Sequence, residues 1–262
     1  MSPSNLVAIT NLPSPLLYLG VRTFADEAAV DFEIALRQHE QYRGALERCG
    51  CRVISLEVNR EHPDSVFVED TALVLDEMAI MMSPGAASRR GEPLGIEPAL
   101  REFRKIARVE PPATIDGGDI VRSGKQLYVG ESQRTNAAGI SALGALSRES
   151  GYSVASIPVF GCLHLKSACS ALPDGRFLVN PDWIDVSPLP QDRLLPVPDS
   201  EAWAGDVLVI GERIIVSDAF PDTIELLGRE GWEVIPVGVS EFAKVEGGVT
   251  CLSLVFSEAA RA

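Results

Sequence analysis

Apolar residues recur along the chain in two alternating spacings. Residues 6–10 form a short continuous apolar run that is typical of a buried strand. Residues 30–49 instead carry apolar side chains three or four positions apart, as an amphipathic helix does. Residues 52–56 return to the strand pattern. The spacing therefore predicts a chain in which strands and helices alternate.

The order strand, turn, strand, helix, strand recurs in about five copies of roughly 40 residues each. The copies span residues 66–106, 119–158, 166–184, 206–236, and a last one that starts at 249–256 and takes its other strands from 6–56. A repeat of this length indicates units arranged around an axis, with both chain ends in one unit. An ordinary mixed α/β sheet is the alternative.

Several local expectations follow from the same pattern. Residues 97–106 are predicted to form a helix, and residues 66–68 and 166–172 to form strands. In the third copy, residues 181–184 stand in place of a full helix. Because no stretch of the 262 residues looks like a domain boundary, we expect one domain over residues 1–262.

Charge and cysteine content narrow the classes of function. The net charge of −14 disfavours nucleic acid as a partner, since an acidic surface repels phosphates, but it is compatible with a small cationic substrate. Five cysteines without a Cys-x-x-Cys pair argue against disulfides and zinc sites. Residues 1–17 lack the pattern of a signal peptide, and no apolar run is long enough for a membrane helix. We therefore expect a cytoplasmic protein with no membrane partner.

His164 is the strongest candidate among the three histidines. It lies in residues 161–167 (GCLHLKS), at the start of an expected hairpin strand, where other copies carry Asp116 or an acidic pair. His39 lies inside an expected helix and His62 lies before a proline in a loop, so packing or surface roles are favoured for both. The place of His164 in the repeat favours a functional role.

Cys251 is the candidate nucleophile. It follows two glycines in residues 246–256 (EGGVTCLSLVF), and glycines before an apolar strand indicate a tight bend that could open a thiol to a cavity. A small buried side chain is the competing interpretation, and it is the one we favour for the other four cysteines.

Acidic and basic residues complete the set of candidates. Glu69 and Asp70 interrupt an apolar run, where carboxylates are costly unless they face a cation. Arg89 and Arg134 offer forks suited to a carboxylate. Together with a Cys/His pair, these groups indicate a zwitterionic, amino-acid-like substrate with a guanidinium group. The three scattered histidines make no metal cluster, and thiolate attack on a protonated guanidinium requires no cofactor.

Six ordered motifs over nearly the whole chain resemble dimethylarginine dimethylaminohydrolase, a family of the guanidinium-modifying superfamily. The motifs are residues 64–70 (DSVFVED), 88–92 (SRRGE), 116–119 (DGGD), 130–136 (GESQRTN), 163–167 (LHLKS) and 246–251 (EGGVTC). The resemblance implies a five-bladed α/β propeller of ββαβ units with pseudo-fivefold symmetry. It also suggests a homodimer.

The resemblance further implies which residues act on the substrate. Cys251 matches the nucleophile, His164 the proton donor and later base, and Asp116 the carboxylate that orients the histidine. Substrate-binding positions match Asp64, Glu69, Asp70, Arg89, Arg134 and Val245. The implied reaction hydrolyses the guanidinium C–N bond of Nω-methylated arginine to citrulline and an amine through a covalent cysteine adduct.

Two departures from the family pattern concern selectivity. Glu246 stands where the family more often has Asp, and residues 20–28, which match the family's lid, lack its leucine-containing pattern. A hydrolase or deiminase acting on arginine or another substituted guanidine is therefore the main alternative. An amidinotransferase, a non-catalytic binder of arginine derivatives and a purely structural repeat domain are further alternatives that the candidate residues favour less.

Overall fold

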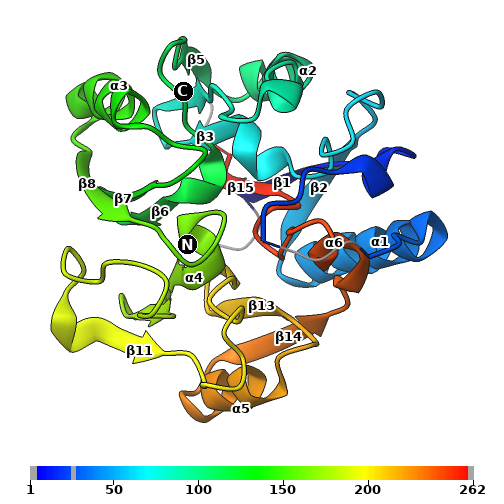
Figure 1. Cartoon of the computed structure of the whole chain (residues 1–262), viewed down its shortest axis with the longest axis vertical. Helices are drawn as coiled ribbons and strands as arrows, with labels where there is room; N and C mark the ends of the chain where they lie inside the picture. The colour runs from blue at the N-terminus through cyan, green and yellow to red at the C-terminus, as the bar shows by residue number, and fades with distance from the viewer. Residues whose placement is uncertain (1–4, 25–27, 259–262) are drawn as a thin grey trace.

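The computed structural model describes residues 5–24 and 28–258. Within these residues the strands form five three-stranded sheets arranged as a ring, which we call blades 1 to 5 (Figure 1). In every blade the central strand pairs antiparallel with one neighbour and parallel with the other. The predicted five-bladed α/β propeller is confirmed.

Blade 1 joins the two ends of the described chain. Its central strand β1 (Leu6–Asn11) lies between β15 (Leu254–Ser257) and β2 (Cys51–Leu56). Helix α1 (Phe32–Arg48) connects β1 to β2, and the Asp31 side chain caps it by accepting a hydrogen bond from the Ile34 amide. The predicted sharing of one unit between both chain ends is therefore correct.

Blades 2 and 3 follow the complete repeat. Blade 2 consists of β3 (Ala72–Val74), β4 (Met78–Met81), α2 (Glu92–Arg101) and β5 (Lys105–Arg108). Blade 3 consists of β6 (Ile120–Ser123), β7 (Gln126–Glu131), α3 (Ala137–Ser147) and β8 (Ser153–Pro158).

Blade 4 departs from the repeat and blade 5 restores it. Blade 4 begins with the short helix α4 (Leu165–Ala168) and has strands β9 (Cys169–Ala171), β10 (Phe177–Val179) and β11 (Leu194–Pro196). As expected, no α-helix lies between β10 and β11, where the structure has the 3-10 turn η7 (Gln191–Arg193). Blade 5 consists of β12 (Leu208–Ile210), β13 (Arg213–Ser217), α5 (Pro221–Arg229) and β14 (Glu233–Val237). A short helix α6 (Ser240–Ala243) follows it.

Three local predictions were wrong. The helix predicted at 97–106 is α2, which begins at Glu92 because Pro93 fits its first turn, and it ends before residues 105–108 add a parallel strand to blade 2. The strand predicted at 66–68 gives way to the 3-10 turn η3 (Val68–Thr71). The strand predicted at 166–172 is divided between α4 and β9.

The hydrophobic core is divided among the interfaces between neighbouring blades. Buried apolar side chains form five clusters, and each cluster contains residues of two adjacent blades. In one of them, Ile9 and Phe256 of blade 1 pack with Ala79 and Met81 of blade 2. Because each blade buries apolar surface on both sides, the ring is closed by the hydrophobic effect. No described helix is long and apolar enough to cross a membrane.

The first strand of each repeat faces the centre of the ring. Residues of β3, β6, β9, β12 and β15 line an axial channel of about 480 Å³. The segments that lead into these strands therefore meet near the axis, and they carry most of the predicted site residues.

Candidate active site

A small cavity of about 20 Å³ near the axis brings most of the predicted residues together. Its lining includes seven of the nine predicted site residues: Asp64, Asp70, Arg89, Arg134, His164, Val245 and Cys251. Asp116 contacts this set through His164. The remaining one, Glu69, lines the axial channel instead.

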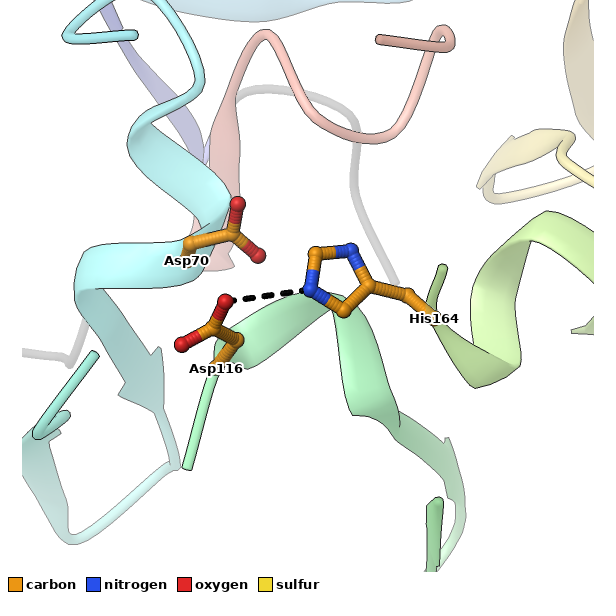
Figure 2. Close-up of side chains that lie close together, drawn as sticks. All are labelled: Asp70, Asp116 and His164. Atoms are coloured by element: carbon orange, nitrogen blue, oxygen red, sulfur yellow. Dashed lines mark hydrogen bonds and ion pairs between the residues drawn. The ribbon is translucent and has the colours of Figure 1, made fainter. Parts of the chain in front are cut away.

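His164 and Asp116 form a buried pair at one side of the cavity (Figure 2). His164 Nε2 donates to Asp116 Oδ2 over 3.1 Å, and Asp116 Oδ1 accepts a hydrogen bond from the Gly85 amide at 2.9 Å. The imidazole lies so close to the Gly118 backbone that a Cβ there would be 2.7 Å from Nδ1. These contacts fix the orientation of the ring.

His164 is held in its protonated form. Burial alone lowers the pKa of a histidine, but the carboxylates of Asp70, Asp119 and Asp116 act in the opposite direction and raise the pKa of His164 to about 9. At neutral pH the ring therefore carries a proton that it can donate. Asp119 was missed as a site residue, although it ends the DGGD motif from which Asp116 was selected.

Asp119 organises the segment that carries His164. It is fully buried and accepts hydrogen bonds from the hydroxyls of Ser132 and Thr135, both at 2.6 Å, and from the Leu165 amide at 2.9 Å. Burial raises the pKa of Asp119 to about 6 despite these donors. Because Leu165 directly follows His164, the Asp119 carboxylate fixes where the histidine enters the site.

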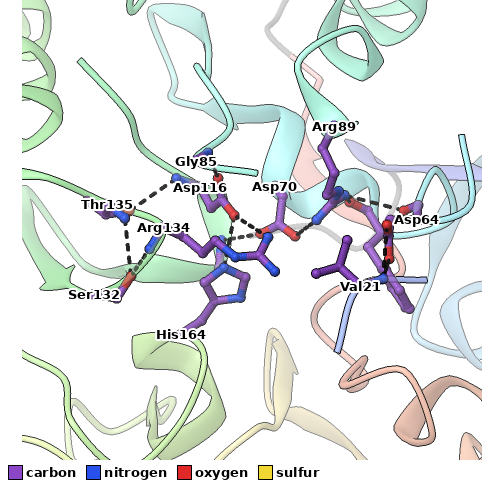
Figure 3. Close-up of polar contacts among 12 residues, drawn as sticks. Val21, Asp64, Asp70, Gly85, Arg89, Asp116, Ser132, Arg134, Thr135 and His164 are labelled. Atoms are coloured by element: carbon purple, nitrogen blue, oxygen red, sulfur yellow. Dashed lines mark hydrogen bonds and ion pairs between the residues drawn. The ribbon is translucent and has the colours of Figure 1, made fainter. Parts of the chain in front are cut away.

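Asp70 and Arg89 form a second buried pair (Figure 3). Arg89 Nη1 lies 2.5 Å from Asp70 Oδ2, and Asp70 Oδ1 accepts from the Gly118 amide at 2.9 Å. Burial raises the pKa of Asp70, but His164 and Arg89 together lower it to about 2. Asp70 is therefore ionised and can face a cation.

The guanidinium of Arg89 is already surrounded by acceptors. In addition to Asp70, it donates to Glu92 at 2.8 Å and to the carbonyl oxygens of Asp64 and Phe67. The guanidinium of Arg134 is held less tightly than that of Arg89, because its Nη1 lies 3.6 Å from Asp116 Oδ2. Of the two arginines predicted to hold a substrate carboxylate, Arg134 has more capacity for a new partner.

Glu69 points away from its neighbour Asp70. Its carboxylate accepts hydrogen bonds from Lys166 Nζ at 2.5 Å and from Thr250 Oγ1 at 2.9 Å, on the side of the axial channel. Asp70 and Cys251 face the cavity, whereas the adjacent Glu69 and Thr250 face the channel. The Glu69–Lys166 pair therefore belongs to the channel, and Lys166 is a second residue that sequence reasoning missed.

Cys251 lies in a turn, three residues before β15 rather than at the start of the strand as expected. The residue is half-buried, and its Sγ accepts a hydrogen bond from the Gly248 amide at 3.4 Å. Burial raises the pKa of the Cys251 thiol, and the nearby carboxylates of Asp206, Glu69 and Asp70 raise it further. Burial and these carboxylates therefore favour the protonated thiol.

The described part of the predicted lid is tied to the rim of the cavity. The Val21 amide donates to Asp64 Oδ1 at 3.1 Å, and the Thr23 amide donates to Glu246 Oε1 at 2.7 Å (Val21 and Asp64 are drawn in Figure 3). Arg22 Nε donates to the Lys244 carbonyl at 2.8 Å. Residues 25–27 of the predicted lid lie outside the described residues.

Among the described residues, Asp70, Asp116 and His164 bring three possible metal-ligand atoms within 4.8 Å of one another. The oxygen atoms of these carboxylates are already occupied by hydrogen-bond donors of the protein. Asp70 Oδ1 already accepts a hydrogen bond from the Gly118 amide, Asp70 Oδ2 accepts one from Arg89, and Asp116 Oδ2 is hydrogen-bonded to His164 Nε2. We therefore interpret the three as an imidazole between two carboxylates, of which Asp116 is hydrogen-bonded to His164 and Asp70 is bound to Arg89.

The ring of blades around a cysteine, a histidine and carboxylates defines the class as a guanidinium-modifying α/β propeller. The family described as N,N dimethylarginine dimethylhydrolase, eukaryotic, matches residues 21–162. A protein of Streptomyces coelicolor named N(G),N(G)-dimethylarginine dimethylaminohydrolase is 41% identical over 252 residues, which cover 96% of this chain and 97% of that protein. The chain belongs to the dimethylarginine dimethylaminohydrolase family.

Solved structures agree with this assignment. A Pseudomonas aeruginosa DDAH, a cysteine-to-serine mutant complexed with citrulline, superposes with a TM-score of 0.88 at 35% identity, over 95% of this chain and 98% of that one. The N-terminal domain of the cyanobacterial arginine dihydrolase ArgZ has a TM-score of 0.87 at 20% identity, over 97% and 98% of the two chains. The latter likeness shows the shared fold alone.

Proposed function

We propose that the protein hydrolyses Nω-methylated arginine to citrulline and methylamine or dimethylamine through a covalent adduct on Cys251. The observation that carries the proposal is the convergence of Cys251, His164 and Asp70 on one small cavity. The names of the relatives and the citrulline bound in the Pseudomonas aeruginosa mutant support the choice of substrate.

Substrate binding would first change the charge beside the nucleophile. A guanidinium lying between Asp70 and Cys251 adds a positive charge directly beside the thiol. Since a nearby cation favours a thiolate, the Cys251 proton is released as the substrate binds. Asp64, Arg134 and the Val245 backbone would bind the remainder of the substrate, and Arg89 would act by holding Asp70.

The reaction then proceeds by two displacements. The Cys251 thiolate attacks the guanidinium carbon, and the C–N bond to the methylated nitrogen breaks as His164 protonates the departing amine. This leaves an S-alkylthiouronium adduct. His164, now neutral, takes a proton from a water molecule that attacks the same carbon. The hydroxyl of the resulting adduct loses its proton to water as the C–S bond breaks, and citrulline and the thiolate are released. Asp116 keeps the imidazole in place through both steps.

The test compares variants with matched substrates. Purified protein is incubated separately with dimethylarginine, monomethylarginine and arginine, and citrulline and the released amine or ammonia are quantified. We expect methylated arginines to be preferred and Cys251→Ser and His164→Ala to lose turnover while remaining folded. Preferred release of ammonia from arginine would support the deiminase alternative. Unchanged turnover by Cys251→Ser would end the covalent mechanism.

Three further proposals extend this one. We propose that residues 1–262 act as one unit, in the cytoplasm, as a homodimer. The homodimer is supported by the family resemblance alone, and light scattering coupled to size-exclusion chromatography tests it. A mass of one chain at the concentrations used for activity would reject the dimer.

A further inference from the structure

In each blade, a segment near the axis leads into the first strand. In four blades this segment carries a predicted active-site residue: Asp70 before β3, Asp116 before β6, His164 before β9 and Cys251 before β15. The corresponding segment of blade 5 had no predicted site residue. There the structure places Asp206, two residues before β12, as Asp70 lies two residues before β3.

Asp206 contacts the turn that carries the nucleophile at two points. Its Oδ1 accepts a hydrogen bond from the Thr250 amide at 3.2 Å. Its Oδ2 packs against Gly248 so closely that a Cβ on Gly248 would lie 1.5 Å away. Thr250 directly precedes Cys251, and the Gly248 amide donates to the Cys251 sulfur. The Asp206 carboxylate therefore contacts both Thr250, which precedes the nucleophile, and Gly248, whose amide is bound to the Cys251 sulfur.

The place of Asp206 distinguishes it from the groups that would touch substrate. Asp206 does not line the small cavity. It lines a neighbouring groove of about 580 Å³, together with Gly247, Gly248 and Val249 of the nucleophile turn. The turn thus lies between the cavity and a buried carboxylate.

We propose that Asp206 is a positioning residue for Cys251, which holds the nucleophile turn through Thr250 and Gly248 and presents a negative charge to the thiol from outside the substrate cavity. The charged and titratable groups near Asp206 are Glu69 of η3, Lys166 of α4, Tyr42 of α1 and Cys251 itself. Lys166 is the cation among these, and it is bound to Glu69.

The electrostatics agree with this geometry. Burial and then the Glu69 charge raise the pKa of Asp206 to about 7. After burial, Asp206 has the largest effect among the causes that raise the pKa of the Cys251 thiol. Removing its charge while keeping its hydrogen bond should therefore make the thiol easier to ionise.

The first experiment measures the thiol itself and requires no turnover. The rate of alkylation by iodoacetamide is followed against pH in Asp206→Asn and, as a matched control, in Asp218→Asn, an exposed aspartate lining the same groove. Cys251→Ser gives the background, since the other four cysteines are buried. We expect the Asp206→Asn profile to move to lower pH by about half a unit or more and the control to match wild type. An unmoved profile in Asp206→Asn would overturn the electrostatic role.

The second experiment uses turnover and so rests on the proposed function. Asp206→Ala removes both contacts with the turn, and we expect kcat to fall about tenfold or more while KM changes less than about twofold. Asp206→Asn, which keeps an acceptor for Thr250, should recover most of kcat. A raised KM with an unchanged kcat, or no recovery by Asn in a folded variant, would contradict the positioning role. Because alkylation is measured without substrate, failure of the proposed reaction would not be mistaken for failure of this inference.

Discussion

Arg89 Nη1 lies 2.5 Å from Asp70 Oδ2, so the carboxylate predicted to bind a substrate guanidinium is already bound to one from the protein. Both side chains are buried, and Arg89 also neutralises Glu92. The protein arginine and a substrate guanidinium would therefore share Asp70. Arg89 consequently combines a structural role with its place beside the substrate.

Replacing Arg89 by Met should destabilise the fold strongly, because Asp70 and Glu92 would remain buried without their cation. We expect a loss of about 3–5 kcal/mol in the free energy of unfolding. Urea denaturation measures it, and Arg90→Met is the matched control because Arg90 is exposed and should change stability by less than about 0.5 kcal/mol. Equal stability of the two variants would show that the buried pair contributes little.

The raised pKa of His164 should make stability depend on alkaline pH. A group whose pKa is higher in the folded state stabilises the fold fully below its unfolded value of 6.5 and loses this contribution as pH rises through about 9. The difference between these values corresponds to on the order of 3 kcal/mol. We therefore expect wild type to lose more unfolding free energy than His164→Gln between about pH 6 and about pH 10.

Urea denaturation at both pH values measures this difference. The His164→Gln variant also controls for every other group that titrates in this pH range, including Cys251, because both proteins contain those groups. Parallel pH dependence in the two proteins would mean that His164 is neutral in the folded state, and His164 would then not start the reaction as a proton donor.

The repeat and the polar residues that break it could be predicted from sequence because both are local signals. Asp70 interrupts an apolar run and Cys251 follows two glycines, and both line the cavity. The direction in which each polar side chain faces could not be predicted from sequence. Glu69 and Asp70 are adjacent in the 3-10 turn η3, and the geometry of that turn sends one to the channel and the other to the cavity.

Long-range partners were equally hidden from sequence reasoning. Lys166 is 97 positions from Glu69, and Asp206 is 44 positions from Thr250. Neither pairing leaves a local pattern, since each arises where segments of different blades meet at the axis. The repeat is the signal that indicates Asp206, because this residue stands two residues before the first strand of blade 5, as Asp70 does in blade 2.

Shortening Glu246 to Asp should loosen the segment above the cavity. Glu246 Oε1 accepts hydrogen bonds from the amides of Thr23 and Phe24, and a side chain one methylene shorter would not reach both. Hydrogen bonds to a charged group stabilise by about 1.5–3 kcal/mol, so KM should rise by about tenfold. Kinetics with methylated arginine measures KM.

Trypsin cleavage after Arg22 gives a second measurement of the same contact, because a loosened segment is more accessible to a protease. Glu212→Asp, at an exposed turn, is the control and should leave both KM and cleavage unchanged. If Glu246→Asp behaves like this control, the contacts of Glu246 with residues 23 and 24 do not govern access to the cavity.

Gly248→Ala should disrupt the nucleophile turn, because the added Cβ would lie 1.5 Å from the buried Asp206 Oδ2. Either the carboxylate or the turn must move, and the hydrogen bond from the Gly248 amide to Cys251 would be lost. We expect a loss of roughly 1–3 kcal/mol in unfolding free energy and a fall in kcat of about tenfold or more.

Gly228→Ala is the control. This glycine lies in α5 with open space around it, and alanine there should stabilise the helix by about 0.5–1 kcal/mol without affecting kcat. A Gly248→Ala variant with wild-type kcat would show that the turn tolerates displacement, and that close packing against Asp206 is not needed to place the thiol.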